Sequence, residues 1–395
     1  MGIETGAAAE SLRGVHRELR QWLFDIALPL WWNVGGDREQ GGFFEKISHD
    51  GRSVEAPRRT RVVGRQIYAY ATAGRMGWPG PAAAAVEHGL DYLLTRCLKP
   101  DCTLHSQTAP DGAVIRAEFD LYDHAFALFG LAAAGGFRDD RERLAGIARQ
   151  IREAMIDGWK HPQRGFEEAV PRRLPLLANP HMHILEACLA WIETGPAAGD
   201  DGWDRLADEI VELCLDRFLH PDSGALREFF DGDWMPVAGE DGRIVEPGHQ
   251  YEWAWLLKRW GRLRGRDDAL AAAGRLVEIA ETWGVDAERG VAFNEIFDDF
   301  TPRDRDARIW PQTERIKAWL ALADIAETFE RRDIAWERAA IAGRGLQRYF
   351  ADDVPGIWYE TMQANGSFVQ EHARASSLYH ITCALFELDA TVSRL

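Results

Sequence analysis

Three short stretches, residues 179–183, 247–252 and 376–380, each place a histidine near the start of an apolar, helix-periodic segment. Imidazole can both take and give a proton near neutral pH, which makes it a common group in general acid–base catalysis. The three candidates are His183, His249 and His380. If the fold brings them into one pocket, we expect proton transfer on a bound substrate.

Two of these histidines have neighbours that suggest their chemistry. A proline shortly before each of His183 and His249 indicates a helix start, because proline is tolerated in the first turn. Near a helix N-terminus the dipole disfavours imidazolium, so we expect both rings to be neutral. Glu186 and Glu252 follow three residues later, a spacing that lets a carboxylate orient a ring on the same helical face.

The chain carries an internal repeat that can bring these distant residues together. Turn-like segments with glycine, an apolar or small residue and usually glutamate recur at residues 41–45, 165–168, 224–228, 290–295 and 356–360. The last four copies start 59, 66 and 66 residues apart. Residues 111–114 lie near the middle of the long gap after the first copy, and we interpret them as a degenerate copy. The sequence therefore predicts six repeats.

Each copy is followed by a helix-like segment with apolar residues at spacings of three and four. These first segments cover residues 65–74, 122–134, 181–191, 249–260, 313–323 and 376–388. A second, more amphipathic segment follows most of them, at residues 141–157, 203–218, 267–283 and 332–350. A hairpin of this size cannot bury its apolar face alone, so the copies must stack or close on themselves.

Six copies with nearly all-apolar first helices favour a closed ring over an open solenoid. We predict an all-α fold, an (α/α)6 barrel with six inner and six outer helices, and short β-hairpins at one mouth. No linker-like or low-complexity stretch interrupts the repeat. Residues 1–395 are therefore expected to form a single catalytic domain.

In such a ring, every inner helix presents one end to the same mouth, so polar groups at matching repeat positions converge. The predicted inner helices offer Arg65, Asp123 with His124, His183, His249, Glu314 and His380. Trp310 precedes Glu314 in a predicted helix start, where it is either a packed core residue or a platform for stacking a sugar. His124 and Arg65 have structural alternatives as well, respectively a satisfied core histidine and a buried ion pair.

Composition excludes several other classes of function. The formal net charge of −17 opposes binding to nucleic acid or to an anionic membrane surface. No apolar run approaches a membrane span and no signal peptide is recognisable, so we expect a cytoplasmic protein. The five cysteines are scattered, which favours free thiols. With no His-Glu-x-x-His, Gly-x-Gly-x-x-Gly or Walker motif, we expect neither a metal nor another cofactor.

At these residues the chain resembles the N-acylglucosamine 2-epimerase superfamily and, within it, the bacterial mannose isomerases. The resemblance extends over essentially the full length, through residues 65–68, 179–183, 247–253, 310–314 and 379–380. It implies an (α/α)6 barrel and metal-free proton transfer. By motif, His249 and His380 correspond to the acid/base pair, and His183 to a second polar contact or ring-opening group.

The resemblance also implies which residues bind the substrate. Arg65 would bind sugar hydroxyls or the developing enediolate oxygen, and Glu252 would orient His249 and bind substrate. A further arginine is expected in the loop before His249, where Arg243 is the candidate. The remaining predicted substrate-binding residues are Glu314, Trp310 and His124.

The resulting hypothesis is an aldose–ketose isomerase that interconverts mannose and fructose through a cis-enediol. The closest alternative is a 2-epimerase acting on a hexose, an N-acylhexosamine or a disaccharide, although residues 377–382 lack the pattern expected of disaccharide epimerases. An (α/α)6 glycoside hydrolase using Glu252 and Glu314, and a non-enzymatic carbohydrate-binding module, are further alternatives. The expected partner is a small monosaccharide, with a homodimer as one possible assembly.

Overall fold

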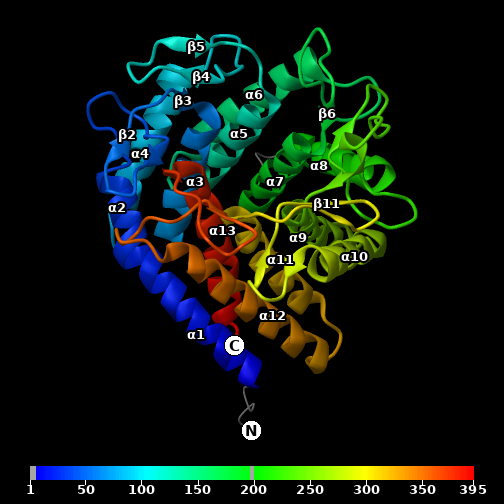
Figure 1. The fold of residues 1–395 in the computed structure, drawn as a ribbon. Coiled ribbons are helices and arrows are strands. Elements are labelled where there is room, and N and C mark those ends of the chain that lie inside the picture. The colour runs from blue at the N-terminus through cyan, green and yellow to red at the C-terminus, as the bar shows by residue number, and fades with distance from the viewer. Residues whose placement is uncertain (1–5, 196–199) are drawn as a thin grey trace.

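The computed structural model describes residues 6–195 and 200–395, and over these residues helices dominate the fold (Figure 1). The inner helices are α3 Thr60–Arg75, α5 Leu121–Gly135, α7 Ala178–Thr194, α9 Pro247–Arg264, α11 Ile309–Ile325 and α13 Ala375–Val392. The outer helices are α1 Ala7–Trp22, α4 Ala82–Tyr92, α6 Arg141–Trp159, α8 Gly202–Leu213, α10 Asp267–Trp283 and α12 Phe329–Gln347. A short helix, α2 (Leu28–Asn33), follows α1.

The inner helices form a closed ring. Each packs against the next in chain order, and α13 packs against α3. Outer helices follow their inner partners along the chain, except that the partner of α13 is α1, from the opposite end of the sequence. The two ends are joined by a hydrogen bond from Arg13 to the Leu395 carbonyl at 2.7 Å and by a contact of 2.9 Å between His16 Nε2 and Asp389 Oδ1. The predicted (α/α)6 barrel is confirmed.

Close packing of α3 against α5 explains why glycines lie within these helices. A Cβ atom at Gly64 would lie 2.2 Å from the carbonyl oxygen of Phe126, and one at Gly130 would lie 2.7 Å from the carbonyl oxygen of Gly64. No real Cβ fits at such distances, so glycine permits the approach despite its cost in helix propensity. The apolar character of the inner helices follows from their burial on all sides.

Short antiparallel strand pairs surround the end of the barrel at which the inner helices begin (Figure 1). The strands are β1 Lys46–Ile47, β2 Ser53–Val54, β3 Arg58–Arg59, β4 Gln107–Thr108, β5 Val114–Arg116, β6 Leu176–Leu177, β7 Phe229–Phe230, β8 Ile244–Val245, β9 Val285–Asp286, β10 Val291–Ala292, β11 Glu295–Phe297, β12 Pro302–Asp304, β13 Ala307–Arg308, β14 Thr361–Met362 and β15 Ala373–Arg374. Strands directly before inner helices pair with strands of the next repeat, as in β3–β4, β6–β7, β8–β11, β13–β14 and β15–β1. These pairs fix where five of the six inner helices start, all except α5.

Glutamates of the repeated turn motif also fix the helix starts. Three of them accept a hydrogen bond from the backbone N–H of the residue that precedes an inner helix, in the pairs Glu45–Arg59 at 2.7 Å, Glu168–Leu177 at 3.2 Å and Glu360–Arg374 at 2.6 Å. A buried backbone donor at a helix start needs such an acceptor. The motif is therefore structural as well as repetitive.

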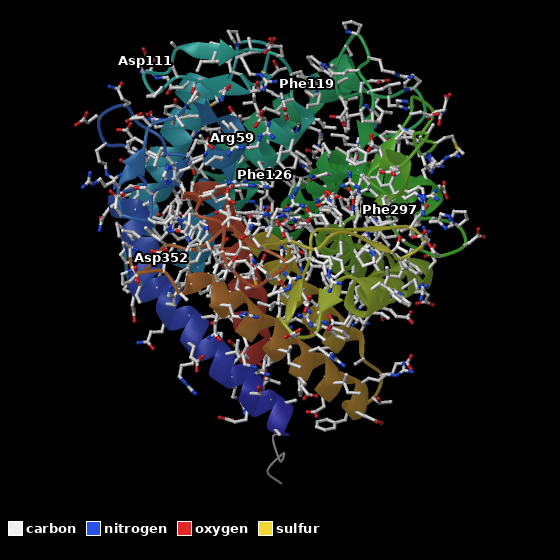
Figure 2. All side chains as sticks on the ribbon, viewed as in Figure 1. Arg59, Asp111, Phe119, Phe126, Phe297 and Asp352 are labelled. Carbon is white, nitrogen blue, oxygen red and sulfur yellow. The ribbon has the colours of Figure 1, made fainter. Side chains whose placement is uncertain are left out.

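One predicted repeat position is wrong. The motif glycines adopt positive φ, for example +74° at Gly165, and the matching residue of the second repeat is Cys102, whose φ is +62°. Leu104 then forms the β-bridge typical of this motif. Residues 111–114 belong instead to the β4–β5 hairpin, and Asp111 lies at the outer edge of the mouth (Figure 2). Because a cysteine replaces glycine in this left-handed turn, the second copy of the motif could not be recognised from the sequence pattern.

Candidate active site

The common register of the inner helices builds one layer of side chains inside the barrel. The residue six positions after the N-cap faces this interior in each helix, as Arg65 does relative to Arg59 in α3 and His183 does relative to Leu177 in α7. The members of the layer are Arg65, Phe126 (labelled in Figure 2), His183, Glu252, Glu314 and His380. His249 lies one turn nearer the mouth.

A cavity of about 230 Å³ opens above this layer at the mouth with the short strands. Its lining includes the predicted residues Arg65, His183, His249, Glu252, Trp310 and His380. Residues far apart in sequence are thus brought to one place, as the repeat predicted. Glu314 is fully buried behind His380 and does not line the cavity.

His380 is held by Glu314. Its Nδ1 donates to Glu314 Oε1 at 2.9 Å, which leaves Nε2 as the free nitrogen of the ring. Burial lowers the pKa of His380 well below its ordinary value, and the positive charges of Arg65 and Lys317 act in the same direction. The ring is therefore neutral and can accept a proton.

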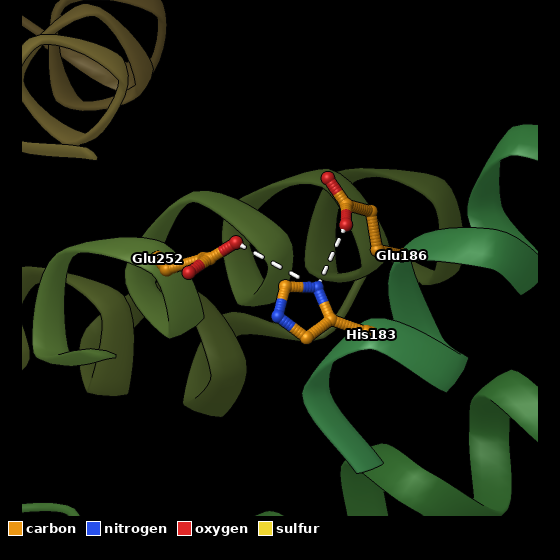
Figure 3. A group of neighbouring side chains, drawn as sticks. All are labelled: His183, Glu186 and Glu252. Atoms are coloured by element: carbon orange, nitrogen blue, oxygen red, sulfur yellow. Dashed lines mark hydrogen bonds and ion pairs between the residues drawn. The ribbon is translucent and has the colours of Figure 1, made fainter. Parts of the chain in front are cut away.

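His183 is held in a similar way by Glu186. Its Nδ1 lies 3.0 Å from Glu186 Oε2 and 3.9 Å from Glu252 Oε1 (Figure 3). Tyr379 donates its hydroxyl to both oxygens of Glu186, at 2.6 and 2.7 Å. Burial lowers the pKa of His183 to about 4, despite the adjacent carboxylate. The predicted partner, three residues away, is confirmed, and the lowered pKa agrees with the prediction of a neutral ring.

His249 differs from the sequence-based prediction in its partner and its charge. Its Nδ1 forms an ion pair with Glu228 Oε2 at 3.0 Å and lies 3.9 Å from Glu246 Oε2, whereas Glu252 points toward His183. Burial opposes a charged ring, but the charges of Glu228 and Glu246 outweigh it and raise the pKa of His249 to about 9. His249 is thus protonated at neutral pH. Two nearby carboxylates exceed the influence of the helix dipole on which the prediction rested.

Glu252 lies among other acidic groups. Burial, together with the charges of Glu314 and Glu186, raises its pKa well above the ordinary carboxyl value. Its Oε1 is buried and has no hydrogen-bond partner among the described residues. A neutral carboxyl group in this position can donate a hydrogen bond to a substrate hydroxyl.

Arg65 and Trp310 complete the walls of the cavity. Arg65 donates to the Tyr122 hydroxyl at 2.6 Å and lies over the Phe126 ring at 4.0 Å. Within residues 6–195 and 200–395 its guanidinium has no carboxylate within 4.0 Å, and its Nε is buried without a partner. The Trp310 ring lies 5.0 Å from the His249 ring and 5.7 Å from the His380 ring.

His124, a predicted substrate-binding residue, lies outside the cavity. Its Nδ1 donates to the Asp120 carbonyl at 2.7 Å, and its Nε2 accepts from the Leu104 backbone N–H at 3.1 Å. His181 makes the matching pair of bonds in α7, and Gln250 and Gln312 do so in α9 and α11. This repeated position ties an inner helix to a motif turn, so both ring nitrogens of His124 are committed to the backbone.

Arg243, like His124 and Glu314, is a predicted residue that does not line the cavity, and it lies in a short 3₁₀-helix, Asp241–Arg243. Its side chain binds Asp298 at 3.1 Å and Asp299 at 2.6 Å. It is not among the residues that line the cavity. The loop before α9 therefore does not supply an arginine to this site.

Comparisons with known proteins place this architecture in a family. The family model for N-acylglucosamine 2-epimerase matches residues 42–384. The chain belongs to this family. It is 46% identical to a mannose-6-phosphate isomerase of Rhizobium meliloti (strain 1021), covering 96% of this chain and 97% of that protein. It is 29% identical to a D-mannose isomerase of Thermobifida fusca, covering 79% and 80%.

Comparison with a solved structure confirms the fold. The cellobiose 2-epimerase of Spirochaeta thermophila DSM 6192 superposes with a TM-score of 0.84 at 23% identity, over 98% of each chain. Similarity at this level establishes the shared (α/α)6 barrel. The family model and the two relatives together identify this chain as an enzyme of a sugar isomerase and epimerase family.

The rim of the cavity in this protein carries arginines that were not predicted as site residues from the sequence. They are Arg59, Arg61, Arg308 and Arg374. Each is paired with a carboxylate, in the pairs Arg59–Glu45 at 2.5 Å, Arg61–Asp123 at 2.7 Å, Arg308–Glu246 at 2.8 Å and Arg374–Glu371 at 2.5 Å. All of them lie at or just after the N-cap of an inner helix, and this shared position could have identified them from the sequence as residues of the cavity rim.

Asn179, Tyr122 and Ser377 were likewise not predicted as site residues, yet all three line the cavity. Asn179 Oδ1 is buried without a hydrogen-bond partner among the described residues. Asn179 and Tyr122 each lie two positions after an N-cap, one turn above the interior layer. Extending the repeat register by one turn would have found both.

Carboxylates and imidazoles here also come close enough to be compared with metal sites. Three groups have candidate ligand atoms within 4.8 Å of one another: His183 with Glu186 and Glu252, His249 with Glu228 and Glu246, and His380 with Glu252 and Glu314. In each group, the histidine Nδ1 already faces a carboxylate at about the distance of a hydrogen bond, 2.9 to 3.0 Å. The arrangement therefore resembles carboxylate-oriented acid–base groups.

Proposed function

We propose that this protein is an aldose–ketose isomerase that interconverts mannose and fructose. The observation that supports it most directly is that one cavity holds a protonated and a neutral histidine. His249, with a pKa of about 9, is a proton donor at neutral pH, and His380, whose pKa is well below its ordinary value, is a proton acceptor. Environments that separate two pKa values in this way assign the acid and the base.

In this proposal, His249 opens the sugar ring. Its imidazolium gives a proton to the ring oxygen as the bond from that oxygen to C1 breaks. The imidazole, now neutral, takes the proton of the C1 hydroxyl as the aldehyde forms, which restores the imidazolium. Glu228 and Glu246 hold the charged ring beforehand. General acid help of this kind contributes about 10²- to 10⁴-fold.

His380 then moves the proton between the two carbons. Nε2 takes the proton from C2 while the His249 imidazolium gives a proton to O1, which yields a cis-enediol. Protonated His380 then returns its proton to C1, and the hydroxyl on C2 gives its proton to neutral His249 as the ketone forms. Arg65 lies on the neighbouring helix α3 and stabilises the negative charge that develops on oxygen. The net change is proton transfer only, so this chemistry needs no redox cofactor.

The size of the cavity favours a single sugar. Its volume of about 230 Å³ is below the range of about 300–1,000 Å³ typical for drug-sized ligands. The relative from Rhizobium meliloti is named for a phosphorylated mannose, and a phosphate would lie against the arginines at the rim of the cavity. Those arginines are already paired with carboxylates, whereas Arg65 is free of one, so we propose the unphosphorylated hexose as the preferred substrate.

A 2-epimerase is the second candidate, and one observation favours it. The cavity contains a second neutral imidazole, His183, beside Glu252. Epimerisation requires proton return to the opposite face of C2, and two bases on different helices could serve the two faces. The family model is itself described by a 2-epimerase activity.

One experiment separates these functions. The protein is incubated with mannose, or with mannose 6-phosphate, in deuterated water, and NMR identifies the product and the labelled carbon. We expect fructose with deuterium at C1 and a higher kcat/KM for unphosphorylated mannose. Glucose labelled at C2 would establish the epimerase instead. Absence of both exchange and product would refute both, and a glycosidase would be recognised by release of sugar from an aryl glycoside.

A further inference from the structure

A second layer of side chains lies beneath the catalytic one, three positions further along each inner helix. Its members are Tyr68, Phe129, Glu186, Trp255, Lys317 and Cys383, and all are buried. Lys317 is 0% exposed. Its ammonium lies 2.6 Å from Glu314 Oε2 and 3.8 Å from the centre of the Trp255 ring. Burial of a lysine carries a large desolvation cost, so its partners must compensate for it.

Lys317 is connected to the cavity through a single carboxylate. Glu314 contacts Lys317 through Oε2 and accepts from His380 Nδ1 through Oε1. In a neutral imidazole, the hydrogen bond made by one nitrogen decides whether the other is a donor or an acceptor. While Glu314 is a carboxylate, the proton of His380 stays on Nδ1 and Nε2 keeps its lone pair.

Charged and titratable groups from the neighbouring helices surround Lys317 and His380. Lys317 is influenced by Glu314 on its own helix, by Glu252 on α9, by Glu186 on α7 and by Cys383 on α13, whose Sγ lies 3.6 Å from Nζ. Arg65 on α3 and His183 on α7 act on His380. Burial raises the pKa of Glu314, and the ammonium of Lys317 opposes that rise.

Building on the proposed isomerase function, we propose that Lys317 is a positioning residue that keeps Glu314 ionised and thereby fixes His380 in the tautomer with a basic Nε2. Without the ammonium, a protonated Glu314 donates its own hydrogen to Nδ1. The imidazole hydrogen then lies on Nε2, and the ring presents a donor to the substrate carbon in place of a lone pair. Lys317 touches no substrate in this arrangement.

The Lys317→Met variant tests this role, because methionine keeps an unbranched apolar stem and removes the charge. We expect kcat to fall about 10- to 100-fold, as for other losses of groups that orient a reacting ligand, with a smaller change in KM. The acidic limb of the kcat/KM profile should move to higher pH, because Glu314 must then lose a proton against a higher pKa. In a Glu314→Gln background the same substitution should have little further effect. A folded Lys317→Met protein with unchanged kcat and pH profile overturns the proposal.

A measurement on the unmodified protein covers the case in which the variant fails to fold. With ¹⁵N-labelled histidine and lysine, NMR should show His380 protonated at Nδ1 only, and the Lys317 ammonium should remain charged above the pH at which free lysine titrates. An Nε2–H tautomer or a neutral Lys317 at neutral pH overturns the proposal. These signals do not depend on turnover of any sugar, so failure of the proposed function is distinguishable from failure of the positioning role.

Discussion

Replacing His124 and His181 by glutamine should remove much of the acid sensitivity of this protein without affecting catalysis. Each ring accepts a backbone N–H and donates to a backbone carbonyl four residues earlier. Glutamine makes the same bonds at the matching positions of α9 and α11, where Gln250 and Gln312 lie. The double variant His124→Gln/His181→Gln is therefore a substitution that the fold itself already uses.

The size of the effect follows from the pKa values. Burial lowers the pKa of His124 to about 4 and that of His181 to about 4, against an ordinary value of 6.5. The unfolded chain therefore binds the proton first as pH falls, so stability is present above about pH 6.5 and is lost on the way to about pH 4. As pH falls from about 7 to about 5, protonation of each histidine in the unfolded chain should lower the free energy of unfolding by about 2 kcal/mol, or by about 4 kcal/mol for the pair.

The assay is urea unfolding as a function of pH, followed by circular dichroism. The double variant should match the parent near neutral pH and exceed it by about 4 kcal/mol near pH 5, and each single variant should give about half of that difference. His183 remains in all of these proteins, so its own contribution cancels. Parallel pH curves for parent and double variant would refute the reasoning. Loss of kcat in the folded His124→Gln protein would instead support the original assignment of His124 to the substrate.

Three further predictions address catalysis and packing. His380→Asn should lower kcat by about 10²- to 10⁴-fold with little change in KM, measured by product formation from mannose, and full turnover would remove His380 from the mechanism. kcat/KM should fall as pH rises through about 9, where His249 loses its proton. The Glu228→Gln variant should move this alkaline limb of the pH profile to lower pH. A limb that does not move would show that Glu228 does not set the charge of His249. Gly64→Ala should destabilise the fold by about 1–3 kcal/mol, because the new methyl would lie 2.2 Å from the Phe126 carbonyl oxygen, and calorimetry with an unchanged Tm would contradict the close approach of α3 and α5.

Much of the fold and part of the site follow from the repeat in the sequence. Helices with a common start and a common register must place matching residues in one layer, which is why Arg65, His183 and His380 meet although 118 and 197 residues separate them along the chain. The pairing of His183 with Glu186 was equally accessible, because both lie on one helix at a spacing set by helix geometry. Local periodicity contains this information.

What the sequence could not indicate depends on contacts between repeats. His249 has a glutamate at the same helical spacing as His183, yet it pairs with Glu228 from the preceding motif turn. That ion pair makes the ring positively charged where a neutral ring was predicted. His124 occupies a helix position close to that of the catalytic residues but is committed to backbone groups of a neighbouring turn. Sequence therefore determined which residues share a layer of the barrel, because a repeated helix sets register. Only the tertiary structure decided their partners and protonation, because those depend on burial and on charges that arrive from other parts of the chain.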